Sequence, residues 1–265
     1  MALQVRQALK VMMTAIAAAE AGAPADAYRR ALQLRFQVYC LECNFLAPEG
    51  FPQGMESDEH DADAAHFYAF DAHDDLVGYV RLVHADVHGR FPLQAHCRLD
   101  PSQTLAHPSQ AAEVSRLMVR RDYRRRRGDR LAGVTAAQHR AVLAGERRHQ
   151  APQILLSLYR QMYAYSCRNG IRVWYAAMDR ALFRSLKRLS FCFTPLGPQS
   201  DYFGPVIPYM GDLLHIEREV GVRYPGLLHW LQSSEPVHGQ LGALHGRKHD
   251  RIDGPDDDAL LIAGT

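Results

Sequence analysis

Hydrophobic and polar positions divide the first third of the chain into a helix, a loop and a hairpin. Between Ala27 and Cys43, apolar side chains gather on one side and arginines on the other, which predicts a helix. The stretch from Asn44 to Ala64 is rich in Pro, Gly and acidic residues and is predicted to be a loop. Two β-rich runs follow, His66–Phe70 and Val77–Val83, and the polar residues between them predict a hairpin turn.

Helices and strands alternate in the rest of the chain. An apolar run that opens at Glu113 predicts a central strand, after an irregular segment from Gly89 to Pro108. Beyond it we expect helices at Leu131–Leu143, Ile154–Asn169 and Arg180–Leu189, and strands at Ile171–Ala177, Phe191–Leu196 and Tyr202–Met210. Gly170 closes the second of these helices, as a glycine just past a helix end does. This order predicts a single α/β domain over residues 1–232, with a mixed central sheet flanked by helices. Gly, His and Asp accumulate in residues 233–265, which are predicted to form a flexible tail.

Composition narrows the class of protein. The 265 residues are 47% hydrophobic, which is enough for a substantial core, and the net charge of +2 excludes a general polyanion binder. Five cysteines at irregular positions do not form a disulfide framework, so a reducing, cytoplasmic location is expected. The single pair Cys40 and Cys43 lacks the further ligands of a zinc site, and these cysteines are interpreted as packing residues.

The N-terminal residues imitate a secretory signal. Arg6 and Lys10 precede a short apolar run, but the run is alanine-rich and Glu20 interrupts it. We interpret this segment as a first strand or helix, with export as the alternative. No stretch reaches the ~18–20 apolar residues of a membrane-spanning helix.

Candidate chemistry centres on Glu113 and Arg116 and on the basic turn that follows them. A bend in the strand is needed to set these two side chains side by side. Residues 120–130 hold seven arginines against Asp122 and Asp129, a local balance of +5. A strand, a carboxylate and then a basic turn suit an acyltransferase whose donor carries phosphate.

The acidic loop has three interpretations. Asp58 and Asp61 lie close to His60 and His66, which suggests a metal, but the order of an EF-hand loop is absent. A run of acids is also commonly a solvated loop. The third interpretation is a lattice in which Asp58 and Asp61 hold Arg35 and Arg81, because an arginine inside an apolar strand is costly unless it is paired. We favour the lattice, which would shape an acceptor pocket, and expect no metal site.

Several of these segments resemble known families. Leu34–Tyr39, Phe45, Gly54–Asp61, Val80–Leu82 and Glu113–Arg116 together resemble the acyl-homoserine-lactone (autoinducer) synthases. Tyr39–Glu42 and Phe45–Glu49 resemble the acyltransferases associated with exosortase/PEP-CTERM systems, which in turn look like long-chain N-acyl amino acid synthases. The resemblance runs from about Arg30 to Gly211.

The resemblance implies a GNAT-like acyltransferase fold with acyl-acyl-carrier-protein as the usual donor. The matching polar set is Arg35, Asp58, Asp61, Arg81, Glu113 and Arg116, and Tyr39 and Phe45 match aromatic positions near the acceptor and donor. Phe45 stands where the autoinducer synthases carry Trp, and Tyr39 where they carry Phe. The segment from Tyr202 to Tyr209 looks like the exosortase-associated group instead.

The roles that follow are those of acyl transfer to an amine. Glu113 is the candidate base with Arg116 beside it, and the alternative is a structural ion pair between the two. The resemblance implies that backbone amides of Leu117, Met118 and Val119 serve as oxyanion and thioester donors.

The arginine turn is expected to dock the donor. Arg125 and Gly128 fit a CoA pyrophosphate loop, but Arg130 crowds its third position, which favours the 4′-phosphopantetheine of acyl carrier protein over acyl-CoA. The alternatives are a solvated basic turn and a nucleic-acid site, the latter without a recognised binding fold around it. The expected donor residues are Leu117, Met118, Val119, Arg120, Arg121, Arg124, Arg125, Arg126, Arg127, Gly128 and Arg130.

The sequence therefore predicts an N-acyltransferase that moves a fatty acyl chain from acyl carrier protein to the amine of an amino acid or similar small acceptor, without a permanently bound cofactor. One alternative is an autoinducer-type lactone synthase. The other is a non-catalytic protein of the same fold that binds the carrier protein or a signal.

Overall fold

One mixed sheet organises the part of the chain that the computed structural model describes, residues 26–71, 73–123 and 151–233. Its strands are β1 (Ala64–Phe70), β2 (Leu76–Val83), β3 (Ala111–Val119), β4 (Val173–Met178), β5 (Thr194–Pro195), β6 (Ser200–Asp201) and β7 (Pro205–Asp212). They are ordered β1-β2-β3-β4-β7-β5, and β6 pairs with β7. Strands β3 and β4 are parallel, and the other neighbours are antiparallel.

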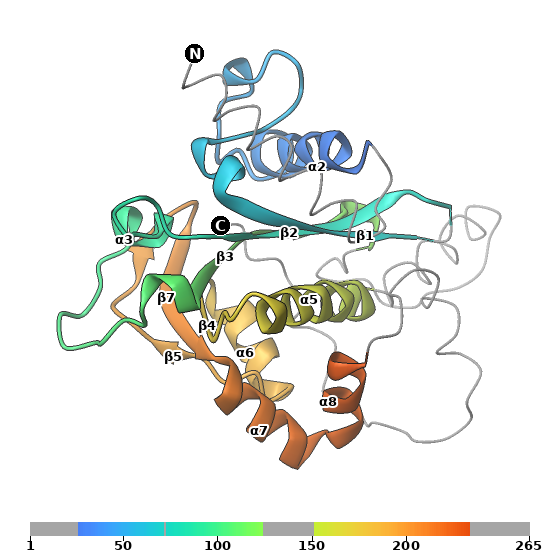
Figure 1. The fold of residues 1–265 in the computed structure, drawn as a ribbon. Helices are drawn as coiled ribbons and strands as arrows, with labels where there is room; N and C mark the ends of the chain where they lie inside the picture. The colour runs from blue at the N-terminus through green and yellow to red at the C-terminus, as the bar shows by residue number, and fades with distance from the viewer. Residues whose placement is uncertain (1–25, 72, 124–150, 234–265) are drawn as a thin grey trace, which may run out of the picture.

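Helices cover both faces of this sheet. They are α2 (Ala27–Phe36), α3 (Pro92–His96), α5 (Ala151–Arg168), α6 (Arg180–Arg188), α7 (Leu213–Arg223) and α8 (Pro225–Gln232). A π-helical turn, η1 (Gln37–Glu42), continues α2, and single 3-10 turns occur at η2 (Pro48–Gly50), η3 (Glu59–Asp63), η4 (Pro108–Gln110) and η5 (Arg121–Tyr123). Figure 1 shows α2 on one side of the β1–β2 hairpin and α5 on the opposite side. Among the helices described, none has the length and hydrophobicity needed to cross a bilayer.

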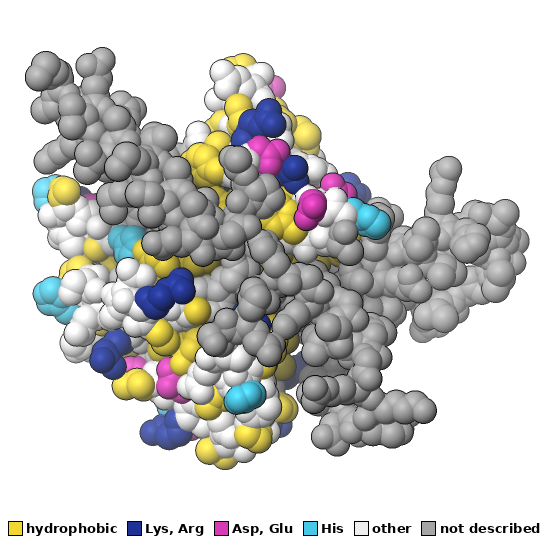
Figure 2. Space-filling model, turned by 45° about the vertical axis from the view of Figure 1, so that its right-hand side comes forward, with side chains coloured by type: hydrophobic (Ala, Val, Ile, Leu, Met, Phe, Trp, Pro, Cys, Tyr) yellow, Lys and Arg dark blue, Asp and Glu magenta, His cyan; other side chains and the backbone are white. Residues whose placement is uncertain are grey.

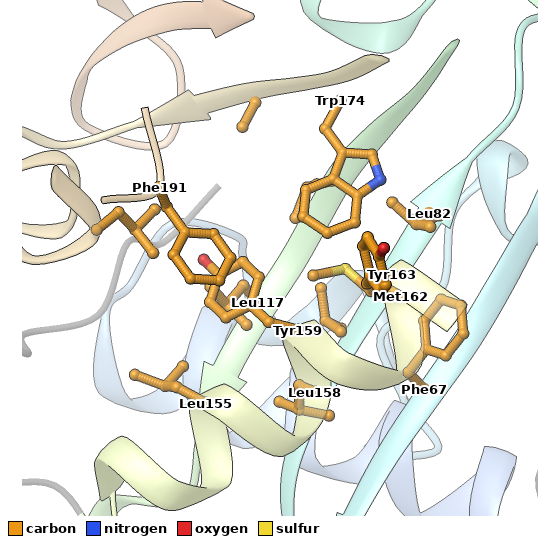
Figure 3. Packing of buried hydrophobic residues seen from close by; sticks show 14 of the residues in the cluster. Phe67, Leu82, Leu117, Leu155, Leu158, Tyr159, Met162, Tyr163, Trp174 and Phe191 are labelled. Carbon is orange, nitrogen blue, oxygen red and sulfur yellow. The ribbon is translucent and has the colours of Figure 1, made fainter. Parts of the chain in front are cut away.

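The main core lies between α5 and the sheet. Apolar side chains from β1, β2, β3 and β4 meet those of α5 there, and the ring of Tyr159 packs against those of Trp174 and Phe191 (Figure 3). The approach is close at Gly78, where a Cβ atom would lie 2.5 Å from Cγ2 of Ile154. Strand β2 therefore needs a glycine at this position for α5 to pack against it.

Most of the predicted elements are present. The helix from Ala27, the hairpin, the central strand, the strand around Trp174 and the helix at Arg180 are confirmed, and Gly170 ends α5 with a φ of +69°. Within the segment predicted to be irregular, α3 forms a single helical turn. The predicted N-terminal segment (1–25), the helix at Leu131–Leu143 and the tail beyond residue 233 lie outside the described residues.

Two expectations about the C-terminal third were wrong or incomplete. Only Thr194 and Pro195 pair as a strand. The amide of Phe191 donates to the carbonyl of Leu186 at the end of α6 and is not free for a ladder, and a proline has no amide hydrogen to donate. The helices α7 and α8 were not predicted. They pack against α5 and bury Val220 and Leu231 in the same core.

Candidate active site

Strand β3 is bent by a bulge at Arg116. A bend of this kind was expected, because Glu113 and Arg116 need it to lie side by side. Tyr79 pairs with Met118 and Arg81 with Ser115, so the register shifts between them. The backbone of Arg116 has a φ of +57°, in the left-handed region that a non-glycine residue adopts at a cost.

The bulge changes which side chains share a face. Ala112, Val114, Leu117 and Val119 all enter the core against α5, so the alternation skips one step at the bulge. Residues on the opposite face, among them Glu113, Ser115 and Met118, lie on the side of the sheet that carries α2 and α3. The expected bend is therefore present, and it places Glu113 and Arg116 on one face.

The ladder between β3 and β4 ends just before the bulge. Their pairing runs from Ala111 with Val173 to Val114 with Ala176, whereas β3 continues to Val119. The amide of Arg120 donates to the carbonyl of Val77, and by the two-residue alternation the amide of Met118 also faces β2. The amides of Leu117 and Val119 then face the opening between β3 and β4. Of the three predicted backbone donors, Met118 is directed to the wrong side.

Three arginines and three carboxylates form a buried lattice beside the bulge. Nε of Arg35 lies 2.5 Å from Oε2 of Glu56, and its Nη1 lies 2.5 Å from Oδ1 of Asp61. Arg35, Glu56 and Asp61 are all buried. Burial opposes ionisation of Glu56, but the hydrogen bond and charge of Arg35 outweigh it and lower the pKa of this carboxyl.

Arg81 completes the second corner of the lattice. Its two terminal nitrogens each lie 2.7 Å from one oxygen of Asp58, a two-pronged contact, and Nη1 also reaches Asp61. Burial disfavours the charge on Asp58, yet the hydrogen bond and charge of Arg81 prevail and hold its pKa well below the usual range. The predicted pairing of Asp58 and Asp61 with Arg35 and Arg81 is therefore present.

The spacing of Asp58 and Asp61 is set by a capping box at the start of η3. The amide of Asp58 donates to Oδ2 of Asp61, at 2.8 Å, and Oδ1 of Asp58 accepts from the amide of His60. The amide of Glu56 donates to the carbonyl of Leu32, which ties the acidic loop to α2. Local backbone hydrogen bonds thus help to orient the carboxylates that the arginines contact.

Arg116 belongs to this lattice and does not pair with Glu113. Its Nη2 lies 3.2 Å from Oε1 of Glu56 and 3.0 Å from Oδ2 of Asp58. Glu56 was not expected as a lattice member. Three buried guanidinium groups require three carboxylates, but the sequence does not distinguish Glu56 from Glu59 and Asp63 in the same loop.

Glu113 is buried and stands apart from these ion pairs. Its Oε2 accepts a hydrogen bond of 2.8 Å from the amide of Leu93, in the first turn of α3, where a helix leaves its amides free. Burial raises the pKa of Glu113 to about 8, against the lowering effects of that hydrogen bond and of the charges on Arg81 and Arg116. A carboxyl with this pKa can hold and release a proton near neutral pH.

An aromatic cluster covers Arg116. The rings of Tyr39, Phe45 and Phe203 lie 5.5–6.0 Å apart, centroid to centroid. Cζ of Arg116 lies 4.6 Å from the centroid of Tyr39 and 5.1 Å from that of Phe203. Tyr39 and Phe45 were predicted near this site from the sequence. Phe203 was not, and no local pattern indicates a contact between segments so far apart in the chain.

Little of the predicted donor loop is described. Nε and Nη2 of Arg120 pair with Asp122, and Nη1 lies 3.5 Å from Asp75, so this side chain is bound to acids. Arg121 is exposed. The other predicted donor residues, Arg124, Arg125, Arg126, Arg127, Gly128 and Arg130, lie outside the described residues. On the face in Figure 2, Lys and Arg side chains of the described part occur in small separate groups.

The described residues form neither a disulfide nor a metal-binding group. Within the described residues, no group of three or more His, Cys, Asp or Glu side chains is arranged to hold a metal ion. Cys40, in η1, is buried and Cys43 is half-buried, and both are free thiols. The lattice carboxylates are occupied by arginines.

Comparison with known proteins agrees with this architecture. A family model described as an acetyltransferase (GNAT) domain matches residues 34–133. BjaI, a CoA-dependent acyl-homoserine lactone synthase solved with SAM and isopentyl-CoA, is 19% identical with a TM-score of 0.54, over 80% of this chain and 84% of BjaI. TofI, solved in a ternary complex with an inhibitor and MTA, is 16% identical with a TM-score of 0.54, over 77% of this chain and 94% of TofI. No curated protein sequence matches this chain. The chain thus carries the GNAT acyltransferase fold, a mixed sheet of seven strands flanked by helices.

Proposed function

We propose that this protein is an N-acyltransferase that moves a fatty acyl chain from a thioester donor to the amine of an amino acid or similar small acceptor. The observation that carries the proposal is Glu113. This carboxyl is buried on the bent strand, next to the opening between β3 and β4, and its pKa is raised to about 8. The arginines nearby are paired with other acids, so Glu113 is available for proton transfer.

The proposed chemistry uses groups on both edges of β3. Glu113 first takes a proton from the acceptor's ammonium group, directly or through a water, and releases it to solvent. The neutral amine nitrogen then attacks the thioester carbonyl carbon, and the amides of Leu117 and Val119 stabilise the oxyanion that forms. The C–S bond breaks, and a second proton passes from the nitrogen to the thiolate, so an amide and a free thiol leave the site.

The donor is proposed to be acyl carrier protein, with its phosphopantetheine entering the opening between the strands. The crowding expected at Arg130 and the basic turn around it support a carrier protein with an acidic surface. BjaI is described as CoA-dependent, which keeps acyl-CoA as the competing donor on this fold.

An autoinducer-type lactone synthase is the second candidate. The similarity to BjaI, solved with SAM, and to TofI, solved with MTA, supports it. The aromatic residues Tyr39 and Phe45 and the resemblance to exosortase/PEP-CTERM-associated acyltransferases favour a different acceptor.

Thiol release from purified protein separates these candidates. Acyl carrier protein and acyl-CoA of the same chain length are offered as donors, each with a panel of amino acids or with SAM. We expect thiol release with an amino acid, together with an N-acyl product whose mass matches that amino acid and the acyl chain of the donor. Release only with SAM would identify a lactone synthase. Donor binding without turnover of any acceptor would identify a binding protein.

A further inference from the structure

Two buried polar atoms beside the bulge have no hydrogen-bond partner among the described residues. They are Nη1 of Arg116 and the hydroxyl oxygen of Tyr39. Arg116 is 3% exposed and Tyr39 is fully buried. Leaving such a group unsatisfied costs about 1–3 kcal/mol, and more for a charged one. Unpartnered buried atoms of this kind are uncommon, and a ligand is one of the ways in which they become satisfied.

The two atoms belong to side chains in direct contact. The guanidinium of Arg116 lies over the ring of Tyr39 and beside that of Phe203. Its Nε and Nη2 are directed to Glu56 and Asp58, which leaves Nη1 as the one unpaired nitrogen of this group. Phe203 is half-buried, so solvent reaches the aromatic cluster at this ring.

The other unpaired guanidinium nitrogens nearby are enclosed by the lattice. Nη2 of Arg35 lies 3.7 Å from Oδ2 of Asp58, and Arg81 already contacts Asp58 and Asp61 through both terminal nitrogens. Arg116 differs because its free nitrogen belongs to the group that the aromatic cluster covers.

Charge balance indicates what the ligand carries. The lattice holds three arginines and three carboxylates and is neutral as a unit. A bare anion would leave an excess negative charge in a buried site, which is unfavourable. A zwitterion brings no net charge. Its carboxylate can accept from Arg116 and Tyr39 while its ammonium group approaches Glu113, on the same face of β3.

We infer that Nη1 of Arg116 and the hydroxyl of Tyr39 bind the carboxylate of the acceptor, and that this contact makes the enzyme select amino acids over amines without a carboxylate. The inference rests on the proposed function and adds the groups that determine acceptor class. Arg116 is then a substrate-binding residue in addition to a lattice member.

The first test needs no mutation. Wild-type protein is offered an amino acid, its carboxamide and the decarboxylated amine with the same side chain, all with one donor. Because a charge-assisted hydrogen bond is lost, kcat/KM is expected to fall about 10- to 100-fold for the two analogues. Equal kcat/KM for all three would overturn the inference and leave the N-acyltransferase proposal standing.

The second test uses two matched variants. Tyr39→Phe removes the unpaired hydroxyl, whereas Tyr68→Phe removes another buried hydroxyl that also lacks a partner in the described structure. Tyr39→Phe is expected to raise KM for the amino acid several-fold and to leave the decarboxylated amine unaffected. Tyr68→Phe is expected to change neither. Identical behaviour of the two variants would contradict the inference.

If the wild-type protein acylates no acceptor, the proposed function is wrong. The carboxylate contact can then still be tested by measuring acceptor binding. Calorimetric titration with the same three compounds is expected to show binding of the amino acid that Tyr39→Phe weakens. Binding that ignores the carboxylate, or no binding, would overturn it.

Discussion

Glu113 and Arg116 lie on the same face of β3 without pairing with each other in the described structure. Arg116 is held by Glu56 and Asp58, and Glu113 accepts its hydrogen bond from the amide of Leu93. The bulge brings the two side chains to one face, but Arg116 pairs with the lattice carboxylates and not with Glu113. This separation allows a buried glutamate to keep a raised pKa close to a group of arginines.

Replacing Glu113 by Gln is expected to lower kcat about 10²- to 10⁴-fold, the range for loss of a general base. Gln has nearly the same shape and can still accept the hydrogen bond from Leu93, so donor affinity should be retained. Glu217→Gln is the control, since that carboxylate lies on α7 and accepts from Tyr163. Turnover that persists unchanged in the Glu113 variant would exclude this residue as the base.

The pH dependence of kcat/KM follows from the same carboxyl. A base has to be deprotonated, and burial raises the pKa of Glu113 to about 8. Activity is therefore expected to rise about tenfold per pH unit below that value and to level off above it. The Gln variant should lack this step. A wild-type profile that is flat between pH 6 and pH 9 would be inconsistent with Glu113 as the base.

Removing one arginine tests how much the lattice contributes to the free energy of unfolding. Arg81→Met deprives Asp58 of both 2.7 Å contacts and leaves buried carboxylates short of a partner. The free energy of unfolding is expected to fall by about 3–5 kcal/mol. Arg90→Met is the control, because its side chain is 65% exposed and its pair with Asp86 is at the surface, so the change should stay within about 0.5 kcal/mol. Urea denaturation of both variants measures this, and equal stabilities would mean that the lattice is not a structural requirement.

The contact between β2 and α5 can be tested at Gly78. An alanine Cβ there would meet Cγ2 of Ile154 at 2.5 Å, so Gly78→Ala is expected to destabilise the protein by about 1–3 kcal/mol. Gly50→Ala, where nothing lies within 4 Å of the new atom, should have little effect. A melting temperature unaltered by Gly78→Ala would mean that α5 does not pack against β2 this closely.

Local patterns predicted the elements that have a clear period. The hairpin of β1 and β2, the central strand and α5 follow from alternation or helical spacing in the residues themselves. The strand predicted from Phe191 to Leu196 was too long, because the amide of Phe191 bonds to the last turn of α6 and strand propensity does not reveal this contact.

The site was predictable in part. Arg81 interrupts an apolar strand, and burying an unpaired arginine costs free energy, so acidic partners were expected. Asp58 and Asp61 were the candidates. The need for a bend between Glu113 and Arg116 also followed from strand geometry. Sequence could not show that Arg116 pairs with Glu56, or that Phe203 covers it, because both contacts join segments far apart in the chain.

Acyl transfer to an amine can be detected in cells by mass spectrometry of lipid extracts. Cells that express the wild-type protein are compared with cells that express the Glu113→Gln variant. We expect an N-acyl amino acid in the first extract that is absent or greatly reduced in the second. An acylated lactone in place of that product, or equal amounts of the N-acyl amino acid in both extracts, would contradict the proposed function.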